Sequence, residues 1–275
     1  RRPRLRSHFD TRAYDGSVPA PGGVNRTLTE DAMTKRGPIL ALGGLVAAVA
    51  LVRRKRLRED LEWHEVEKPG RIVDIDGYGV HVVERGTGGA MLFIHGFGGQ
   101  TFQYRHQLDY FARDHRVIAA DLKGFGYSER DARTGLGHAS QVTMLRALLD
   151  RLGVERVTVV GHSMGGAVAQ RFAATYPDLV DALVLAASMP GDRRPRRAPV
   201  PGVLLRPLLP LLAPVAASRL LAAGFYDPSY LTDDVRAEYV RPARLRGSMD
   251  GLRKMMRDAV SDPPVDASRI TMPVL

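Results

Sequence analysis

The chain has 275 residues, 44% of them hydrophobic, which is enough for one large α/β domain with appendages. It contains no cysteine, so disulfides, thiolate metal sites and a cysteine nucleophile are excluded. The formal net charge of +10 is uneven: residues 1–60 hold 13 Lys and Arg against 6 Asp and Glu, and the remainder holds 27 against 24. No basic stripe interleaved with aromatic residues is present, so the sequence argues against a nucleic-acid-binding protein.

Two segments precede the part that we expect to fold. Residues 1–36 are rich in Arg, Pro, Gly, Ser and Thr, which predicts a disordered extension, and Met33 is a candidate for the true start. Residues 37–52 carry no charge and are followed by a basic run over 53–58. We interpret 37–52 as an uncleaved membrane-anchor helix, although its length of roughly 24 Å is short of the roughly 30 Å hydrocarbon core.

Two other interpretations of residues 37–52 stay open. The segment also fits an apolar helix packed on the domain, or a cleaved signal peptide. The basic residues after it favour a cytoplasmic position for the following domain. A soluble cytoplasmic protein is the alternative.

Residues 61–189 alternate between strand and helix patterns. Asp76-Gly77 joins the first two strands and is a strong hairpin signal. Such alternation predicts a mostly parallel sheet with helices on both faces, preceded by an antiparallel hairpin. The expected strands are 71–75, 79–84, 90–94, 116–120, 156–160 and 182–187, and the expected helices are 101–113, 138–152 and 163–176.

Residues 190–262 break this alternation. Six prolines between 195 and 214 interrupt a Leu-rich run, and helical patterns follow over 232–239 and 249–259. An insert this long is not a simple connection between two strands. We expect a helical cap that covers the carboxyl edge of the sheet and lines an apolar pocket. Residues 263–275 then read as the start of a C-terminal core portion.

Ser163 lies in the pentapeptide Gly161-His162-Ser163-Met164-Gly165, with an apolar strand pattern before it and a helical pattern after it. A serine at a sharp strand-to-helix turn projects its hydroxyl from the end of the sheet, and glycines on either side let the backbone crowd it. The following helix aims free N–H groups, the first from Met164, at an oxyanion formed there. The pattern therefore predicts a nucleophilic serine.

A serine hydroxyl needs a general base, usually a histidine oriented by a carboxylate. None of the eight histidines follows the Ser163 motif, and the chain ends in an apolar strand that has barely begun. The chain also starts at Arg1 and not at a methionine. We therefore expect it to be a piece of a longer product, with the last strands of the sheet and the catalytic acid and base beyond Leu275.

Three ordered motifs resemble those of the α/β-hydrolase superfamily, in particular its capped single-domain serine hydrolases such as esterases and monoacylglycerol-lipase-like enzymes. His95-Gly96-Phe97-Gly98-Gly99 follows the third strand, residues 121–128 (DLKGFGYS) follow the fourth, and the Ser163 motif follows the fifth. The resemblance spans about residues 72–275. It implies the α/β-hydrolase fold with a helical cap.

The resemblance also implies roles for these residues. Ser163 would be the nucleophile, and the backbone N–H groups of Phe97 and Met164 would form the oxyanion hole. His95 and Gly96 would brace the oxyanion loop, as Gly161 and Gly165 support the serine turn, and His162 would line the pocket. Asp121 would secure the turn beneath the site. Asp192, just after the sixth strand, is an alternative place for the acid in some members.

Serine at this turn discriminates within the superfamily, since epoxide hydrolases and haloalkane dehalogenases place aspartate there. We expect cleavage of small carboxylic esters, including lipid-like ones, through an acyl-enzyme, with no metal or organic cofactor. Two alternatives stay open: a non-catalytic, hydrolase-like binding protein, and haloperoxidase-like or carbon–carbon bond cleavage on the same scaffold.

Overall fold

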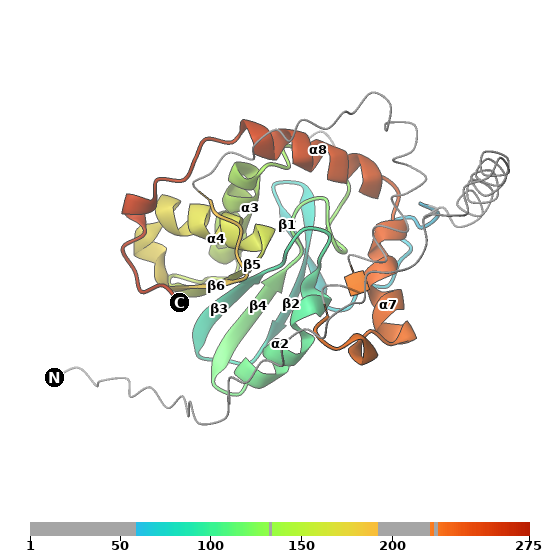
Figure 1. Cartoon of the computed structure of the whole chain (residues 1–275), viewed down its shortest axis with the longest axis horizontal. Helices are drawn as coiled ribbons and strands as arrows, with labels where there is room; N and C mark the ends of the chain where they lie inside the picture. The colour runs from blue at the N-terminus through green and yellow to red at the C-terminus, as the bar shows by residue number, and fades with distance from the viewer. Residues whose placement is uncertain (1–58, 132–133, 192–220, 223–224) are drawn as a thin grey trace, which may run out of the picture. The chain divides into compact units, whose positions relative to one another are not determined.

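The computed structural model describes residues 59–131, 134–191, 221–222 and 225–275 (Figure 1). The predicted hairpin is confirmed: β1 (Arg71–Ile75) pairs antiparallel with β2 (Tyr78–Arg85). Asp76 and Gly77 form the turn with φ values of 53° and 78°, as a two-residue hairpin loop requires.

The sheet has six strands in the order β1-β2-β4-β3-β5-β6. Strand β2 pairs antiparallel with β4, and the four strands from β4 to β6 in this order are parallel. Their carboxyl ends therefore meet at one edge, where α/β sheets bind ligands. The mostly parallel sheet expected from the sequence is confirmed; the remaining strands are β3 (Gly89–Ile94), β4 (His115–Ala120), β5 (Val157–His162) and β6 (Val180–Ala186).

Helices cover both faces of this sheet (Figure 1). In β3, Leu92 and Ile94 belong to the main core with α3 (His138–Arg151) and α4 (Met164–Thr175). Met91 and Phe93 alternate with them and face a second cluster with α2 (Arg105–Phe111). Because successive side chains of a strand point to opposite faces, α2 lies on one face and the helix pair α3 and α4 on the other.

The helix expected over 101–113 is divided. A 3-10 turn, η1 (Thr101–Tyr104), comes first, and α2 follows it and ends at Phe111. The buried carboxylate of Asp121 accepts the N–H of Thr101 at 2.6 Å and holds the start of η1 against the end of β4. This tertiary contact has no signature in the local sequence. A second 3-10 turn, η2 (Pro177–Leu179), precedes β6.

The two helices expected late in the cap are confirmed as α7 (Asp233–Val240) and α8 (Ser248–Ser261). Short 3-10 turns lie around them: η3 (Pro228–Tyr230), η4 (Pro242–Arg244) and η5 (Ala267–Arg269). Glu59 accepts the N–H groups of Gly247 and Met249 at 3.1 and 2.7 Å, which satisfies two free donors where α8 begins. The proline-rich part of the expected cap, residues 192–220, lies outside the described residues, as does Asp192.

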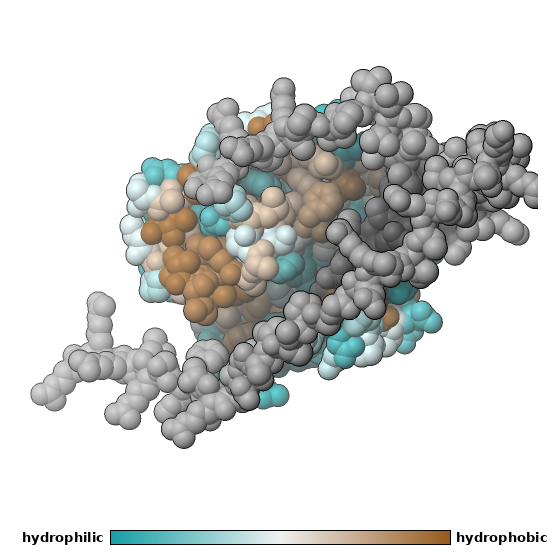
Figure 2. All heavy atoms as spheres, in the orientation of Figure 1, coloured by the Kyte–Doolittle hydropathy of each residue, from teal (hydrophilic) through white to brown (hydrophobic). Residues whose placement is uncertain are grey.

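The final residues extend the sheet beyond β6. Val274 forms a parallel bridge with Leu183, and the N–H of Leu275 donates to the carbonyl of Leu183 at 2.9 Å. The strand expected near residue 272 therefore takes the parallel position next to β6. Figure 2 shows apolar surface at this edge, where Val274 and Leu275 are exposed.

The expected disordered extension (residues 1–36) and membrane anchor (residues 37–52) lie outside the described residues. Among the helices that the structure does describe, none is both long enough and apolar enough to cross a bilayer. The anchor interpretation concerns residues outside this part of the chain and stays a prediction.

Candidate active site

Ser163 occupies the turn between β5 and α4 with φ 53° and ψ −119°. This backbone conformation lies outside the regions that L-residues favour, so it is strained. Ser163 is held there by its own backbone: its N–H donates to the carbonyl of Ala186 at 3.1 Å, and its carbonyl accepts the N–H of Met189 at 2.9 Å. The sharp strand-to-helix turn expected from the sequence is therefore present.

The glycines of the motif allow close backbone contacts at this turn. A Cβ atom on Gly165 would lie 2.2 Å from the carbonyl oxygen of Ile94 and 2.4 Å from that of His95. A Cβ atom on Gly161 would lie 2.6 Å from the carbonyl oxygen of Gly165. Only glycine fits these positions without displacing β3 or α4.

The loop after β3 lies directly against Ser163. A Cβ atom on Gly96 would lie 3.1 Å from the Cβ atom of Ser163 and 3.0 Å from Nδ1 of His162. In the described part of the chain, no backbone or side-chain acceptor takes the N–H of Phe97 or of Met164. Two free backbone donors thus flank the loop and the serine, the arrangement that an oxyanion hole needs.

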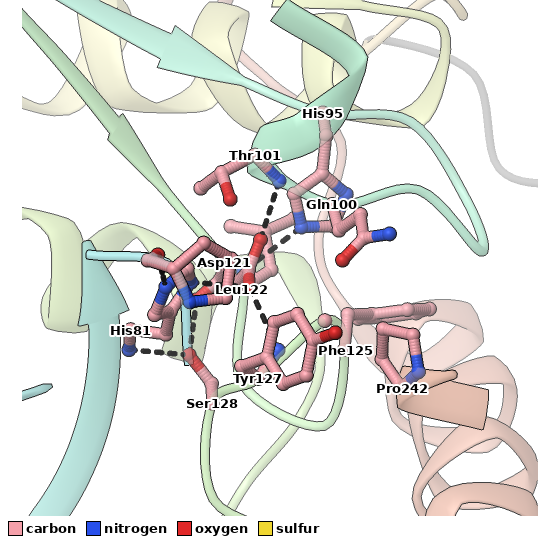
Figure 3. Close-up of polar contacts among 12 residues, drawn as sticks. His81, His95, Gln100, Thr101, Asp121, Leu122, Phe125, Tyr127, Ser128 and Pro242 are labelled. Atoms are coloured by element: carbon pink, nitrogen blue, oxygen red, sulfur yellow. Dashed lines mark hydrogen bonds and ion pairs between the residues drawn. The ribbon is translucent and has the colours of Figure 1, made fainter. Parts of the chain in front are cut away.

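His95 joins this loop to the turn after β4 (Figure 3). Its Nδ1 atom lies 2.8 Å from the carbonyl oxygen of Gly96, and its Nε2 atom accepts the N–H of Leu122 at 3.0 Å. These partners require a neutral ring with its proton on Nδ1. Complete burial lowers the pKa of His95, which outweighs the opposite effect of the Asp121 charge. The ring is thus built into the loop and is not free to exchange protons with a substrate.

Asp121 organises the turn after β4 (Figure 3). Its carboxylate accepts the N–H of Thr101 at 2.6 Å, the N–H of Tyr127 at 2.7 Å and the Nδ1–H of His81 at 2.7 Å. Burial acts to raise the pKa of Asp121, but the hydrogen bond and charge of His81 outweigh it, and the pKa lies below its usual value. The carboxylate faces these donors and not Ser163.

His81 is a buried polar residue that the sequence analysis did not identify. It lies in β2, 40 residues before Asp121, and is fully buried. A histidine among the apolar residues of a strand is a weak signal for a buried hydrogen bond between two side chains, and nothing in the sequence indicates which residue is its partner.

His162 is half-buried, and its Nδ1 atom has no hydrogen-bond partner among the described residues. Burial lowers the pKa of its ring. No described side chain donates to or accepts from the Ser163 hydroxyl, so the structure brings neither His162 nor any other described histidine into that role. Within the described residues, no group of three or more His, Asp or Glu is arranged to hold a metal ion.

A cavity of about 100 Å³ lies beside the oxyanion loop, between the turn after β4 and the end of the cap. His162 does not line it, and its expected pocket-lining role stays a prediction. The lining residues include Gly98, Gly99, Gln100, Phe125, Arg130 and Leu252.

Sheet order, serine turn and adjoining loop together define an α/β hydrolase, and comparison with known proteins agrees. The family model described as alpha/beta hydrolase fold matches residues 89–243, more than half of the chain. The chain therefore belongs to the alpha/beta hydrolase fold family, as the resemblance of the three motifs implied.

Individual relatives differ in the reaction that their names give. A soluble epoxide hydrolase from Corynebacterium sp. (strain C12) is 29% identical over 222 residues, which cover 73% of this chain and 77% of that protein. The 2-hydroxy-6-oxo-2,4-heptadienoate hydrolase of Pseudomonas putida (strain F1) is 37% identical over 119 residues, 42% of this chain and 43% of that protein. The solved structure of epoxide hydrolase CorEH without ligand matches with a TM-score of 0.60 at 27% identity, covering 75% of this chain and 80% of that one.

These similarities establish a hydrolase family and a small-molecule substrate. The relatives are named for different substrates, so membership of the family does not define which bond is cleaved.

Proposed function

We propose that the protein is a serine hydrolase that cleaves carboxylic esters through an acyl-enzyme on Ser163. The observation that carries this proposal is the strained Ser163 turn, which presents a serine next to the free N–H groups of Phe97 and Met164. Serine favours attack on a carbonyl, because attack on an epoxide carbon would give an ether, which water does not release. An acyl ester on serine, in contrast, is readily hydrolysed.

In this mechanism the Ser163 oxygen forms a bond to the carbonyl carbon as its proton passes to a base. The N–H groups of Phe97 and Met164 stabilise the negative oxygen of the tetrahedral intermediate. The intermediate collapses with loss of the alcohol, which takes up the proton, and leaves the acyl group on Ser163. Water then attacks the acyl-enzyme, which releases the acid and restores the serine.

The supporting residues have defined parts in this proposal. His95 and Gly96 shape the oxyanion loop, because the His95 ring ties this loop to Leu122 and the missing side chain of Gly96 admits Ser163. Gly161 and Gly165 make room for the turn itself. Our expectation that the acid and the histidine base follow Leu275 stays a prediction.

The test is labelling of the intact protein with a fluorophosphonate probe, which reacts with activated serines. We expect Ser163→Ala to abolish labelling and p-nitrophenyl ester hydrolysis. Ser140→Ala, which removes a hydroxyl from the exposed side of α3, is the matched control and should label like the wild type. Undiminished labelling of Ser163→Ala would show that another residue is the nucleophile.

Carbon–carbon bond hydrolysis is a second candidate, favoured by the similarity to the Pseudomonas putida enzyme. Turnover of 2-hydroxy-6-oxo-2,4-heptadienoate, with p-nitrophenyl esters left intact, would replace the ester proposal by this one.

A non-catalytic binding protein is the third candidate, favoured because no described residue hydrogen-bonds to the Ser163 hydroxyl. Retention of an acyl ligand by the intact protein without turnover of any ester would support it.

A further inference from the structure

The cavity beside the oxyanion loop contains one buried acceptor that nothing in the described structure satisfies. Gln100 is 2% exposed and lines the cavity. Its Nε2 atom donates to the backbone carbonyl of Glu238 in α7 at 2.6 Å. A carbonyl only accepts, so the orientation of the Gln100 amide is determined. Its Oε1 atom is left buried, with no hydrogen-bond partner among the described residues.

Two other polar side chains of the cavity are fully engaged. Arg130 uses all five of its N–H groups: Nε donates to Ser248 Oγ at 3.0 Å, and the other donors go to backbone carbonyls of Phe125, Gly126, Ser128 and Pro242. The Ser248 hydroxyl in turn donates to the carbonyl of Pro242 at 3.1 Å. Arg130 therefore has no donor left for a ligand, and the Ser248 hydroxyl already donates one hydrogen bond and accepts another, whereas Gln100 Oε1 has no partner among the described residues.

The rest of the wall is largely apolar, apart from Tyr239, whose side chain is hydrogen-bonded with that of Arg105. Phe125, Pro242, Ala243, Met249 and Leu252 all contribute to it, and Figure 3 shows Gln100 close to Phe125 and Pro242. An apolar cavity of about 150 Å³ holds benzene, so the 100 Å³ found here admits on the order of four non-hydrogen atoms. The complementary group is a short chain, mostly apolar, that carries one O–H or N–H donor.

The cavity lies next to the site of the proposed reaction. Gly98 and Gly99 line it and directly follow Phe97, whose N–H is a proposed oxyanion donor. Gly96, in the same loop, packs against Ser163. The Phe97 ring meets the Phe125 ring of the cavity wall edge-on, with centroids 6.0 Å apart. The loop that contacts Ser163 through Gly96 thus continues directly into the wall of this cavity.

We propose that this cavity binds the hydroxyl-bearing end of the substrate and that Gln100 Oε1 accepts its hydrogen bond. The inference rests on the proposed ester hydrolysis and deepens it. The substrate class becomes carboxylic esters with a terminal hydroxyl on a short aliphatic chain, in either the acyl or the alcohol part.

Matched ester pairs test this on the intact protein. In the acyl pair, p-nitrophenyl 6-hydroxyhexanoate is compared with p-nitrophenyl heptanoate; in the alcohol pair, 4-hydroxybutyl hexanoate is compared with pentyl hexanoate. Within each pair a hydroxyl replaces a methyl group. We expect kcat/KM to be about fivefold higher for the hydroxylated member of one pair, because this ratio corresponds to the net free energy of one hydrogen bond.

Three variants locate the effect. Gln100→Met keeps a chain of similar length without the acceptor, and it should abolish the preference. Ala243→Leu leaves Gln100 intact but fills the cavity, and it should do the same. Gln103→Met changes an amide in η1, the 3-10 turn that directly follows Gln100, outside the cavity lining, and should retain the preference. The ratio within a pair is insensitive to general loss of activity, so a partly unfolded variant does not imitate the result.

A binding experiment separates this inference from the proposed function. Saturation-transfer NMR compares butan-1-ol with its isomer 1-methoxypropane, which has no donor. If no ester is cleaved but butan-1-ol binds better than the ether, and only when Gln100 is present, the cavity assignment stands and the esterase proposal falls. Equal kcat/KM within both pairs, or equal preference in Gln100→Met and wild type, would overturn the inference.

Discussion

The Nδ1 atom of His81 lies 2.7 Å from the Oδ2 atom of Asp121, and both side chains are fully buried. The Nε2 atom of His81 also contacts the carbonyl oxygen of Pro69. These buried contacts tie the β1–β2 hairpin, in which His81 lies, to the turn after β4.

Asp121→Asn should destabilise the protein strongly. The change removes the negative charge beside His81 and leaves a side chain whose one oxygen cannot replace the two that accept from Thr101 and Tyr127. Breaking a buried pair costs about 3–5 kcal/mol, and we expect a loss of this size in the free energy of unfolding from urea titration.

The control for Asp121 is an aspartate in an exposed ion pair. Asp181 pairs with Arg156 at the surface, with side chains 48% and 59% exposed. Asp181→Asn should therefore cost less than about 1 kcal/mol. Similar losses in the two variants would contradict the buried-pair interpretation.

The stability of the protein should fall on mild acidification, in part through His95. Burial lowers the pKa of His95 from 6.5, so the unfolded chain binds a proton more readily than the folded one. The stabilisation is complete above pH 6.5 and is lost as the pH falls from there towards the folded pKa. The loss has a limiting slope of about 1.4 kcal/mol per pH unit for each such group.

His95→Gln should reduce this slope, measured as the free energy of unfolding between pH 7 and pH 5. A glutamine side chain does not titrate in this range. His138 and His162, whose pKa values are also lowered by burial, contribute to the slope that remains. His106→Gln, at an exposed position, is the control for the substitution itself. An unchanged slope in His95→Gln would mean that its ring is not held neutral.

Asp121 acts in a lower pH window. Its pKa lies below the ordinary 3.8, because the contacts with His81 outweigh the burial of the carboxylate. Its contribution is therefore complete above about pH 4 and is lost as the pH falls through the folded pKa. The Asp121→Asn variant should lack this acid limb of the stability curve.

The sequence predicted the sheet more fully than the site. Period-two and helical patterns, with Asp76-Gly77 between the first strands, give most boundaries to within two residues, because these signals are local. The Ser163 turn is local as well, since strand, glycines and helix all lie within about 20 residues. Strand β6 begins at Val180, two residues before the predicted start at residue 182, because the η2 turn ends at Leu179.

The missed residues depend on contacts between distant segments. Gln100 meets Glu238 across 138 residues, and Arg130 meets Ser248 across 118. His81 meets Asp121 across 40. No periodicity or motif encodes such pairs, because they arise only when the cap and the hairpin pack on the sheet.

Gly165→Ala should disrupt the serine turn. Its new Cβ atom would lie within 2.4 Å of the carbonyl oxygens of Ile94, the last residue of β3, and His95, the residue after it. We expect a loss of at least 3 kcal/mol, at the upper end of overpacking costs of about 1–3 kcal/mol. Gly89→Ala is the control, since its Cβ would meet nothing within 4 Å, and it should stay within about 0.5 kcal/mol of wild type. Equal stability of the two variants would contradict the close packing of the turn.

Ser163→Gly should make the protein more stable while it removes the proposed nucleophile. The backbone of Ser163, at φ 53° and ψ −119°, is strained because the residue carries a Cβ atom. Such conformations cost a non-glycine residue about 1–3 kcal/mol of folding free energy. Glycine relieves this strain but loses about 0.5–1 kcal/mol more conformational entropy on folding. The net gain in the free energy of unfolding is about 1 kcal/mol, measured by urea titration. Ser163→Ala, which keeps the Cβ atom and loses only the hydroxyl, should show no such gain. If both variants gain equally, the hydroxyl and not the backbone is the source of the instability, and the strain assigned to this turn is wrong.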